Sequence, residues 1–384
     1  MVTAGIIAEY NPFHMGHIHH IAQTRRAGAT HLVVLMSGNT VQRGEFAILR
    51  KEARARMALA GGADLVLCLP TPWSCARAQS FSAAAVHLMK STGCIDLLSF
   101  GSESGDIHCI QRAAAALRER GVLESLQRRI GEGAPLAAAR QAALEEVDFL
   151  AAQCLRQPND TLNVEYLTQM RQQETSFQPL AIKRIGGEGY HSASELRIII
   201  KSGEFLGEKF STSIFREEFA LGFGPVRGEA LEAAAMARLR SMPPEALALL
   251  PDVSEGLEHL LWRAVRQGRC LEEIESAVVG RRYPRARVRR ILFHALLGVS
   301  ADDFTTLPGY IQILGFNRAG QQVLQRMKAS ASLPLIHRFA DAKKLDISAF
   351  HGYEIESRAT DLMALCMPNV QPCGMEERRE IVLI

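Results

Sequence analysis

Five short, continuous apolar runs divide the first half of the chain and constrain its fold more than any other feature. They occupy residues 2–8, 31–37, 63–69, 95–100 and 179–185. Unbroken runs rich in Val, Ile and Leu are typical of strands buried on both faces of a parallel sheet. The stretches between them have helical patterning, at 49–60, 81–91, 107–119 and 136–157. This alternation predicts an α/β fold with a doubly wound, Rossmann-like parallel sheet and right-handed crossovers.

The second half has a different pattern. After about residue 205 the strand signals fade, and amphipathic helical patterns follow at 228–240, 254–266, 271–279 and 284–297, before a weaker mixed tail from Pro334. Prolines lie between these predicted helices and mark their ends. We therefore predict two domains, an α/β domain at residues 1–205 and a mostly helical domain at residues 206–384.

Composition excludes several classes of protein. No apolar run reaches the roughly 18 residues of a transmembrane helix, and the first residues lack the features of a signal peptide. None of the eight cysteines forms a C-x-x-C pair, so we expect reduced core thiols in a cytoplasmic protein. With 44 basic and 41 acidic residues, only local clusters of charge can indicate a nucleic-acid partner.

The end of the first strand carries the strongest chemical signal. Its apolar run continues into Glu9-Tyr10-Asn11-Pro12-Phe13-His14-Met15-Gly16-His17, and a helical pattern follows. Ligands of doubly wound sheets bind at the carboxyl ends of the strands, where a helix N-terminus attracts phosphate. His14 and His17 are three residues apart, so both can face one pocket and donate to phosphate oxygens. The segment therefore predicts a phosphate site.

A metal site is the alternative interpretation of this segment. Four histidines, His14, His17, His19 and His20, lie within seven residues. Histidines at such spacing can share a metal ion, but no nearby Cys, Asp or Glu completes a ligand set. We therefore favour phosphate binding and expect no dedicated metal site.

H-x-G-H after a first strand resembles the nucleotidyltransferase superfamily, and Ser192-Ala193-Ser194-Glu195-Leu196-Arg197 fits the second motif of that superfamily. Longer matches extend the resemblance over about residues 2–330. They are GIIAEYNPFHMGH, MSGNTVQRGEFAI, LCLPTPWSCARAQSFSAAAV, FGSE, PNDTLNVEY, IKRIGGEGYH, RRYPRARVRRILFHALLG and YIQILGFNRAG. On these motifs the sequence is identified as a member of the tRNA(Met) cytidine acetate ligases.

The resemblance implies an activity and a site. Members of this family use ATP to convert acetate to acetyl-adenylate, releasing pyrophosphate, and then acetylate N4 of the wobble cytidine of elongator tRNA(Met). It implies that 1–205 is the catalytic domain and 206–384 the tRNA-binding domain, with Mg²⁺ held largely by the phosphates. It implies that His14, His17 and Arg184 are catalytic and that Ser192, Ser194 and Arg197 form the second motif. The implied ATP site comprises Ile7, Ala8, Glu9, Tyr10, Asn11, Pro12, Phe13, His14, Met15, Gly16, His17, Ile18, His19, His20, Gly101, Asn159, Arg184 and Ile185.

Some of these residues also have simpler explanations. Gly101 suits an ordinary turn after a strand, Asn159 suits a helix N-cap, and Arg184 suits the protein surface. The polar residues that follow the second predicted strand are equally ambiguous. The sequence does not show whether their role is to bind RNA, to bind phosphate or to support the loop; they are Gln42, Arg43, Lys51 and Arg54.

An arginine cluster marks the expected RNA contact. It holds Arg281, Arg282, Arg285, Arg287, Arg289 and Arg290, with no acid between Glu275 and Asp302. On a helix with its apolar side chains facing inward, these arginines would form a basic outer face suited to phosphate backbone. The alternative is a solvated face or arginines that pair with acids elsewhere in the fold.

The sequence departs from the family pattern at two positions. His191 runs directly into Ser192 where a loop is expected, and Arg50 stands where an acidic residue is expected.

Two other functions are compatible with parts of the sequence. One is a small-molecule adenylyltransferase of the same superfamily, which would leave the helical second half of the chain unexplained. The other is a non-catalytic RNA-binding relative, and the intact H-x-G-H motif and the intact Ser192–Arg197 motif argue against it.

Overall fold

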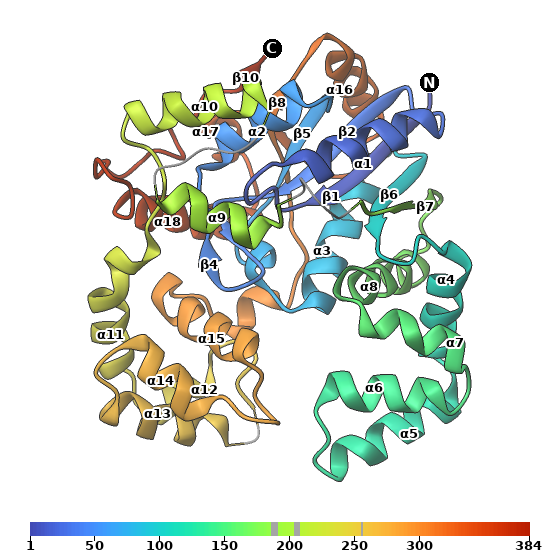
Figure 1. The fold of residues 1–384 in the computed structure, drawn as a ribbon. Coiled ribbons are helices and arrows are strands. Elements are labelled where there is room, and N and C mark those ends of the chain that lie inside the picture. Colours follow the sequence, from blue (N-terminus) through green and yellow to red (C-terminus); the bar gives the residue numbers. More distant parts are fainter. Residues whose placement is uncertain (186–190, 203–207, 255) are drawn as a thin grey trace.

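The computed structural model describes residues 1–185, 191–202, 208–254 and 256–384. In this part of the chain eight strands form one sheet in the order β10-β8-β5-β2-β1-β6-β7, with β9 paired to β8 (Figure 1). The sheet strands are β1 (Thr3–Ala8), β2 (His31–Ser37), β5 (Leu65–Leu69), β6 (Leu97–Ser102), β7 (Gln178–Lys183), β8 (Ile311–Phe316), β9 (Leu335–Ile336) and β10 (Val382–Leu383). A separate hairpin pairs β3 (Thr40–Val41) with β4 (Glu45–Phe46).

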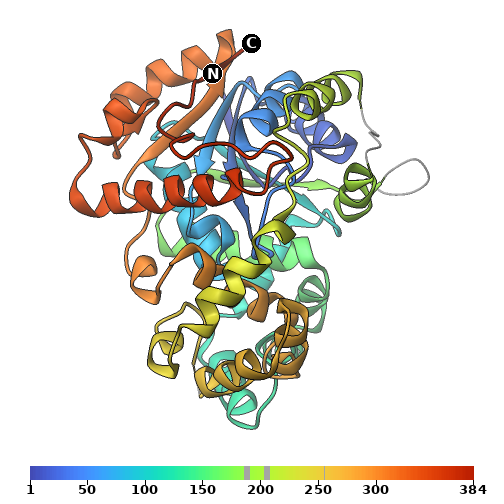
Figure 2. The same cartoon turned by 90° about the vertical axis from the view of Figure 1, so that its left-hand side faces the viewer.

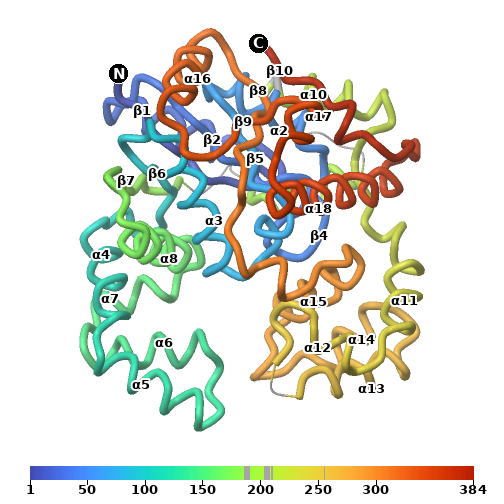
Figure 3. The backbone as a smooth tube through the Cα atoms, turned by 180° about the vertical axis from the view of Figure 1, so that it is seen from behind, coloured from blue at the N-terminus to red at the C-terminus, as the bar shows by residue number. Residues whose placement is uncertain are grey.

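The five predicted strands all lie in this sheet, and those that neighbour each other are parallel. The parallel sheet predicted for residues 1–205 is therefore confirmed, and the whole sheet is mixed because β8, from the second half of the chain, runs antiparallel to β5. The expectation that strands fade after residue 205 is wrong at this side of the sheet. Gln312 interrupts the apolar run of β8, and its amide is buried because it donates to Glu376 Oε1 at 2.6 Å. Figure 3 shows this edge from behind.

Helices cover both faces of the sheet, as a doubly wound fold requires (Figures 1 and 2). Their bounds are α1 (Met15–Arg26), α2 (Lys51–Ala60), α3 (Ala78–Ser91), α4 (Ile107–Ala116), α5 (Arg120–Gly131), α6 (Leu136–Glu145), α7 (Phe149–Ala152), α8 (Pro158–Gln172), α9 (Ala193–Lys201), α10 (Lys209–Ala220), α11 (Glu232–Arg240), α12 (Pro244–Ala248), α13 (Leu257–Gln267), α14 (Leu271–Val278), α15 (Arg285–Leu297), α16 (Arg318–Ser330), α17 (Phe339–Ala342) and α18 (Ile347–Ala364).

Alternate side chains of the central strands build two separate cores. Val33 and Leu35 of β2 pack with α3, α8 and α16 on one face. Leu32, Val34 and Met36 pack with α1, α2, α9 and α10 on the other face. Because successive residues of a strand point to opposite faces, a continuous apolar run is what such a strand needs.

The second half of the chain divides between a helical lobe and the sheet. Helices α11–α15 enclose a core of their own, whereas residues 311–383 contribute three strands to the sheet. The boundary at 205/206 stays a prediction, because residues 203–207 lie outside the described residues. Figure 1 shows that α5 and α6 extend from the sheet on the same side as α11–α15.

The helix predicted at 136–157 is broken. Its first part ends at Glu145, and Asp148 caps the short helix α7, its carboxylate accepting a hydrogen bond from the Ala151 N–H at 2.9 Å. All eight cysteines are free, and five of them are buried as expected, whereas Cys373 is exposed. No helix in the described part of the chain is long and apolar enough to span a membrane.

Candidate active site

His14 and His17 form a reciprocal cap at the start of α1. His14 is the N-cap residue, and its Nδ1 accepts a hydrogen bond from the Gly16 N–H at 3.1 Å. The Nδ1 of His17 accepts from the His14 N–H, also at 3.1 Å. The two rings are stacked, with centroids 3.7 Å apart and planes inclined by 23°. A Cβ on Gly16 would lie 2.9 Å from His14 Cε1, so glycine makes room for the stacked ring.

These hydrogen bonds assign the tautomer of both rings. A neutral imidazole has one donor nitrogen and one acceptor nitrogen. Since both Nδ1 atoms accept from backbone N–H groups, both protons reside on Nε2. The pair therefore presents two neutral N–H donors at the N-terminus of α1, where the helix dipole also favours an anion.

The electrostatic surroundings keep the histidines neutral. Burial, reinforced by the positive charge of Arg184, lowers the pKa of His14 to about 4. Burial and the neighbouring His14 likewise lower the pKa of His17 well below its ordinary value. Burial also lowers the pKa of His20 to about 4, and His20 Nε2 lies 2.9 Å from Ser99 Oγ in β6. His20 thus ties α1 to the sheet, whereas the Nε2 atoms of His14 and His17 make no such bond to any residue that the structure describes.

The loop between β1 and α1 is held from several sides. The Glu9 carboxylate accepts from the Gln42 N–H at 2.8 Å, and Asn11 Oδ1 accepts from the Ile48 N–H at 2.8 Å. Burial raises the pKa of Glu9. Tyr10 is buried with a φ of 48°, a left-handed conformation that costs a non-glycine residue free energy. The segment from β1 to α1 is therefore a rigid support for the two histidines.

The other members of the predicted ATP segment surround this loop. Ile7 and Ala8 end β1, and Pro12 is buried after a cis peptide bond with Asn11. Phe13 is buried with its ring 4.9 Å from that of Tyr10. Met15 is exposed, and Ile18 and His19 follow in α1.

Gly101, Asn159 and Arg184 meet at the carboxyl ends of β6 and β7. A Cβ on Gly101 would lie 3.4 Å from Arg184 Cγ. The Arg184 guanidinium donates to Asn159 Oδ1 at 3.4 Å, and its backbone N–H donates to the Ser102 carbonyl at 2.9 Å. The positive charge of the exposed Arg184 side chain also contributes to the lowered pKa values of His14 and His17. Ile185 follows Arg184 directly.

Asn159 is not the N-cap of its helix. It is the second residue of α8, and the carboxylate of Glu103 caps this helix from outside. Glu103 accepts from the N–H groups of Asn159 and Asp160 at 3.2 and 3.0 Å, and from Asn159 Nδ2 at 2.5 Å. The amide oxygen of Asn159 is thereby turned toward Arg184.

The second motif lies against the same loop. Ser192 caps α9 by accepting from the Glu195 N–H at 3.2 Å. Arg197 donates to the Asn11 carbonyl at 2.7 Å and to Ser194 Oγ at 3.0 Å, and burial lowers its pKa. Residues 186–190, which belong to the IKRIGGEGYH match before Ser192, lie outside the described residues.

Comparisons with known proteins decide the family. Residues 1–378 match the model of the HIGH Nucleotidyl Transferase family. The tRNA(Met) cytidine acetate ligase of Acetivibrio thermocellus is 35% identical over 100% of both chains, and that of Thermoanaerobacter sp. (strain X514) is 34% identical over 98% of both. The chain belongs to the tRNA(Met) cytidine acetate ligases.

A solved structure agrees with this membership. Thermotoga maritima TmcAL bound with alpha-thio ATP is 28% identical to the chain, covers 100% of both chains and superposes with a TM-score of 0.95. The chain is therefore an enzyme of the ligase family. The match over the full length favours the ligase over the small-molecule adenylyltransferase and the non-catalytic RNA-binding protein considered from sequence.

In this ligase the predicted arginine cluster is partly engaged within the helical lobe. Arg285 and Arg289 both pair with Glu275, at 2.7 and 3.0 Å. Arg287 donates to the Asp252 carbonyl at 2.9 and 2.7 Å, and Arg290 lies 3.5 Å from the Asp252 carboxylate. The expected continuous basic face is therefore narrower than the sequence suggested. Arg281 and Arg282 are exposed at its start.

The divergent Arg50 has a partner of its own. Its guanidinium forms two hydrogen bonds with Glu218 of α10, at 2.7 and 2.8 Å, and lies 4.1 Å from the Phe223 ring centroid. The structure thus explains Arg50 as a contact between α10 and the start of α2.

Two residues that contact the candidate site were not predicted from the sequence to belong to it. Glu103 lies in the FGSE motif, from which only Gly101 had been assigned. Arg54, left undecided from sequence, is fully buried and contacts the loop that bears the histidines. No sequence signal separates a buried arginine of this kind from an ordinary surface arginine of a helix.

Proposed function

We propose that this chain uses ATP to activate acetate as acetyl-adenylate and then acetylates N4 of the wobble cytidine of elongator tRNA(Met). The observation that carries the proposal is the stacked pair His14 and His17, whose Nδ1 atoms are held by backbone N–H groups. Two fixed Nε2–H donors at a helix N-terminus suit the charge that develops on a reacting phosphate group.

The first step transfers the adenylyl group to acetate. A carboxylate oxygen of acetate attacks the α-phosphorus, and the bond to pyrophosphate breaks. His14 and His17 would donate hydrogen bonds to the phosphate oxygens, and Arg184, whose charge acts on both rings, would neutralise negative charge on the phosphates or on acetate. Because the histidines stay neutral near pH 7, they act as hydrogen-bond donors rather than as acids.

The second step forms the amide. The cytidine N4 attacks the acetyl carbon, the bond to AMP breaks, and N4 loses a proton. Neither step needs a protein nucleophile, so positioning and charge neutralisation supply the catalysis. The rigid loop of Glu9, Tyr10 and Asn11 fits this requirement, since it fixes where the two donors lie.

Magnesium would bind through the substrate. The described residues contain no group of three or more His, Cys, Asp or Glu side chains able to hold a metal ion. This fits an ion held by the phosphates and water, which is a common mode of Mg²⁺ binding. Its contribution would be to neutralise charge on the phosphates.

We further propose that residues 206–384 contact tRNA and that the enzyme works in the cytoplasm. Within the arginine cluster, the exposed Arg281 and Arg282 are the best candidates for contact with phosphate backbone. Arg285 and Arg289 keep half of their surface exposed while pairing with Glu275, so they can add to the same basic edge.

The test is acetate-dependent ATP–pyrophosphate exchange, with labelled acetate and with or without bulk bacterial tRNA. Exchange together with label in tRNA cytidine supports the proposal. Exchange that requires acetate but leaves tRNA unlabelled would keep the activation step and contradict the proposed acceptor. Absence of exchange under all conditions, with the cognate tRNA included, would contradict the role assigned to His14 and His17.

A further inference from the structure

Arg54 is a fully buried arginine whose partners are carbonyl oxygens. It lies in the first turn of α2 and has no exposed surface. Nη1 donates to the carbonyls of Glu9 and Ser37 at 2.8 and 3.0 Å, and Nε donates to the Leu49 carbonyl at 3.0 Å. Nη2 donates to the Gly38 carbonyl. One side chain thus joins the residue after β1 to the end of β2.

This guanidinium has no carboxylate partner among the residues that the structure describes. Burying a charge without a paired opposite charge lowers the stability of the fold. Burial lowers the pKa of Arg54 to about 10, so the side chain is still charged at neutral pH.

One of the four carbonyls that Arg54 binds lies in the loop between β1 and α1, next to a strained residue. It is the carbonyl of Glu9, so the peptide held is the one between Glu9 and Tyr10. Tyr10 has a φ of 48°, and such a conformation persists in a non-glycine residue only when its surroundings enforce it. Four residues after Tyr10, His14 begins the capped turn that carries the two imidazoles.

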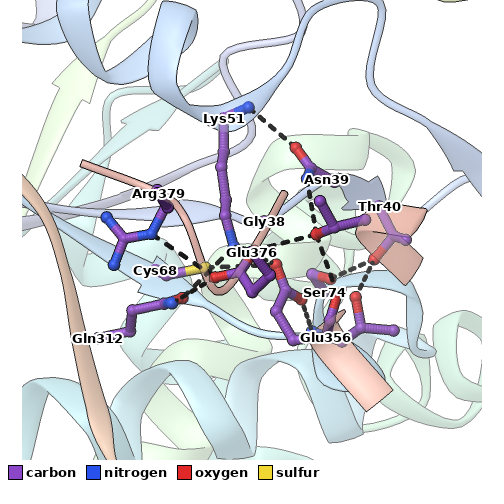
Figure 4. A network of polar contacts seen from close by, with 12 residues as sticks. Gly38, Asn39, Thr40, Lys51, Cys68, Ser74, Gln312, Glu356, Glu376 and Arg379 are labelled. Carbon is purple, nitrogen blue, oxygen red and sulfur yellow. Dashed lines mark hydrogen bonds and ion pairs between the residues drawn. The ribbon is translucent and has the colours of Figure 1, made fainter. Parts of the chain in front are cut away.

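The helix turn that carries Arg54 is anchored by buried ion pairs. Lys51, the first residue of α2, has its Nζ 2.7 Å from Glu356 and 2.7 Å from Glu376, and all three side chains are fully buried (Figure 4). The Lys51 N–H donates to Asn39 Oδ1 at 2.9 Å, and Asn39 Nδ2 donates to Thr360 Oγ1 at 3.0 Å. The start of α2 is therefore fixed to α18 and to the loop after β2.

We propose that Arg54 is a positioning residue for ATP: it holds the Glu9–Tyr10 peptide, and through it the turn that bears His14 and His17. The inference rests on the proposed function, since it assigns a role within the same site. Arg54 acts through the loop and does not itself take part in either bond-forming step.

The experiment compares Arg54→Met and Arg54→Lys with a matched control, Arg326→Met. Arg326 donates to Thr3 Oγ1 at 3.2 Å and so contacts the opposite end of the same strand, β1. Equilibrium binding of ATP and the KM and kcat of acetate-dependent exchange are measured for each protein. Rates are normalised to the folded fraction, taken from thermal unfolding followed by circular dichroism.

Arg54→Met is expected to raise the KM for ATP at least tenfold and to lower kcat/KM by about a hundredfold, the scale of a misplaced catalytic group. Arg54→Lys keeps the charge and part of the hydrogen bonding, so it should recover part of this loss. Arg326→Met should leave both constants within about twofold of the wild type. Should Arg54→Met fail to fold, Arg54→Lys carries the same test.

An unchanged KM and kcat in the folded fraction of Arg54→Met, or an equal loss in Arg326→Met, would overturn the proposal. A wild-type protein that binds ATP but catalyses no exchange would instead contradict the proposed function alone. In that case the proposed role of Arg54 is still tested by comparing the affinities of the Arg54 variants and the wild type for ATP.

Discussion

The imidazole of His17 accepts a hydrogen bond from the backbone N–H of His14, and the two rings stack with centroids 3.7 Å apart. His14 in turn accepts from Gly16 within the same turn. The residues that would contact phosphate therefore also build the helix end on which they lie. Their tautomer, their protonation and their position all follow from one capped turn.

His17→Ala should abolish most of the exchange activity while preserving the fold. Removing one positioned donor to a developing oxyanion typically costs about 10²–10³-fold in rate. We expect a loss of that size in acetate-dependent exchange. His31→Ala, at the amino end of β2, serves as the control with activity near that of the wild type. Equal activity in both variants would remove His17 from the site.

Acid should destabilise the protein through the same histidines. Because burial lowers the pKa of His14 to about 4, the unfolded chain, with a histidine pKa of about 6.5, binds more protons between these values. Stability therefore falls as the pH drops from about 6.5 toward 4. His14→Asn keeps an N-cap acceptor and removes the titration. The urea midpoint of this variant should fall less between pH 7 and pH 5 than that of the wild type. An equal fall in the two proteins would show that His14 does not cause the loss of stability in acid.

Substitution of Gly101 should weaken ATP binding by displacing Arg184. A Cβ at this position meets the flexible side chain of Arg184 and no backbone, so the protein should fold. Gly101→Val should raise the KM for ATP several-fold, with a smaller effect for Gly101→Ala. Gly121→Val in α5, where a Cβ meets nothing within 4 Å, is the matched control. An unaltered KM would show that Gly101 is only a turn residue.

The buried charges around Lys51 should be coupled. Lys51→Met leaves Glu356 and Glu376 without their shared cation, and breaking a buried pair in this way costs about 3–5 kcal/mol. The double variant with Glu356→Gln should lose less stability than the sum of the single variants. Urea unfolding at pH 7 measures all three. Strict additivity would mean that the contacts in Figure 4 contribute independently.

Arg281 offers the clearest test of the basic edge. It is exposed, whereas Arg287 and Arg290 hold the segment at Asp252. Arg281→Ala should lower the salt dependence of tRNA binding by about one phosphate contact without changing the melting temperature. Arg287→Ala with Arg290→Ala should weaken tRNA binding too, but with loss of stability in the lobe. Unchanged salt dependence in Arg281→Ala would exclude this edge from the RNA interface.

The sequence by itself determined five strands of the sheet and where the candidate site should lie on it. Unbroken apolar runs specify strands buried on both faces, and an H-x-G-H segment at the end of the first strand specifies a capped helix at the ligand edge. These features are local, because hydrophobic period and capping depend on residues within one or two turns. The resemblance of the motifs then named the family, which the full-length relatives confirm.

Only the tertiary structure decided which polar residues meet. Gln312 interrupts an apolar run, yet its segment forms strand β8 because Glu376, 64 residues away, satisfies the amide. Arg285 and Arg289 looked equivalent to Arg281 in sequence, but Glu275 of the preceding helix pairs with both. Arg54 reaches the Glu9 carbonyl only because β1 and β2 are neighbours. A charged side chain finds its partner through the packing of distant elements, and no local pattern records that choice.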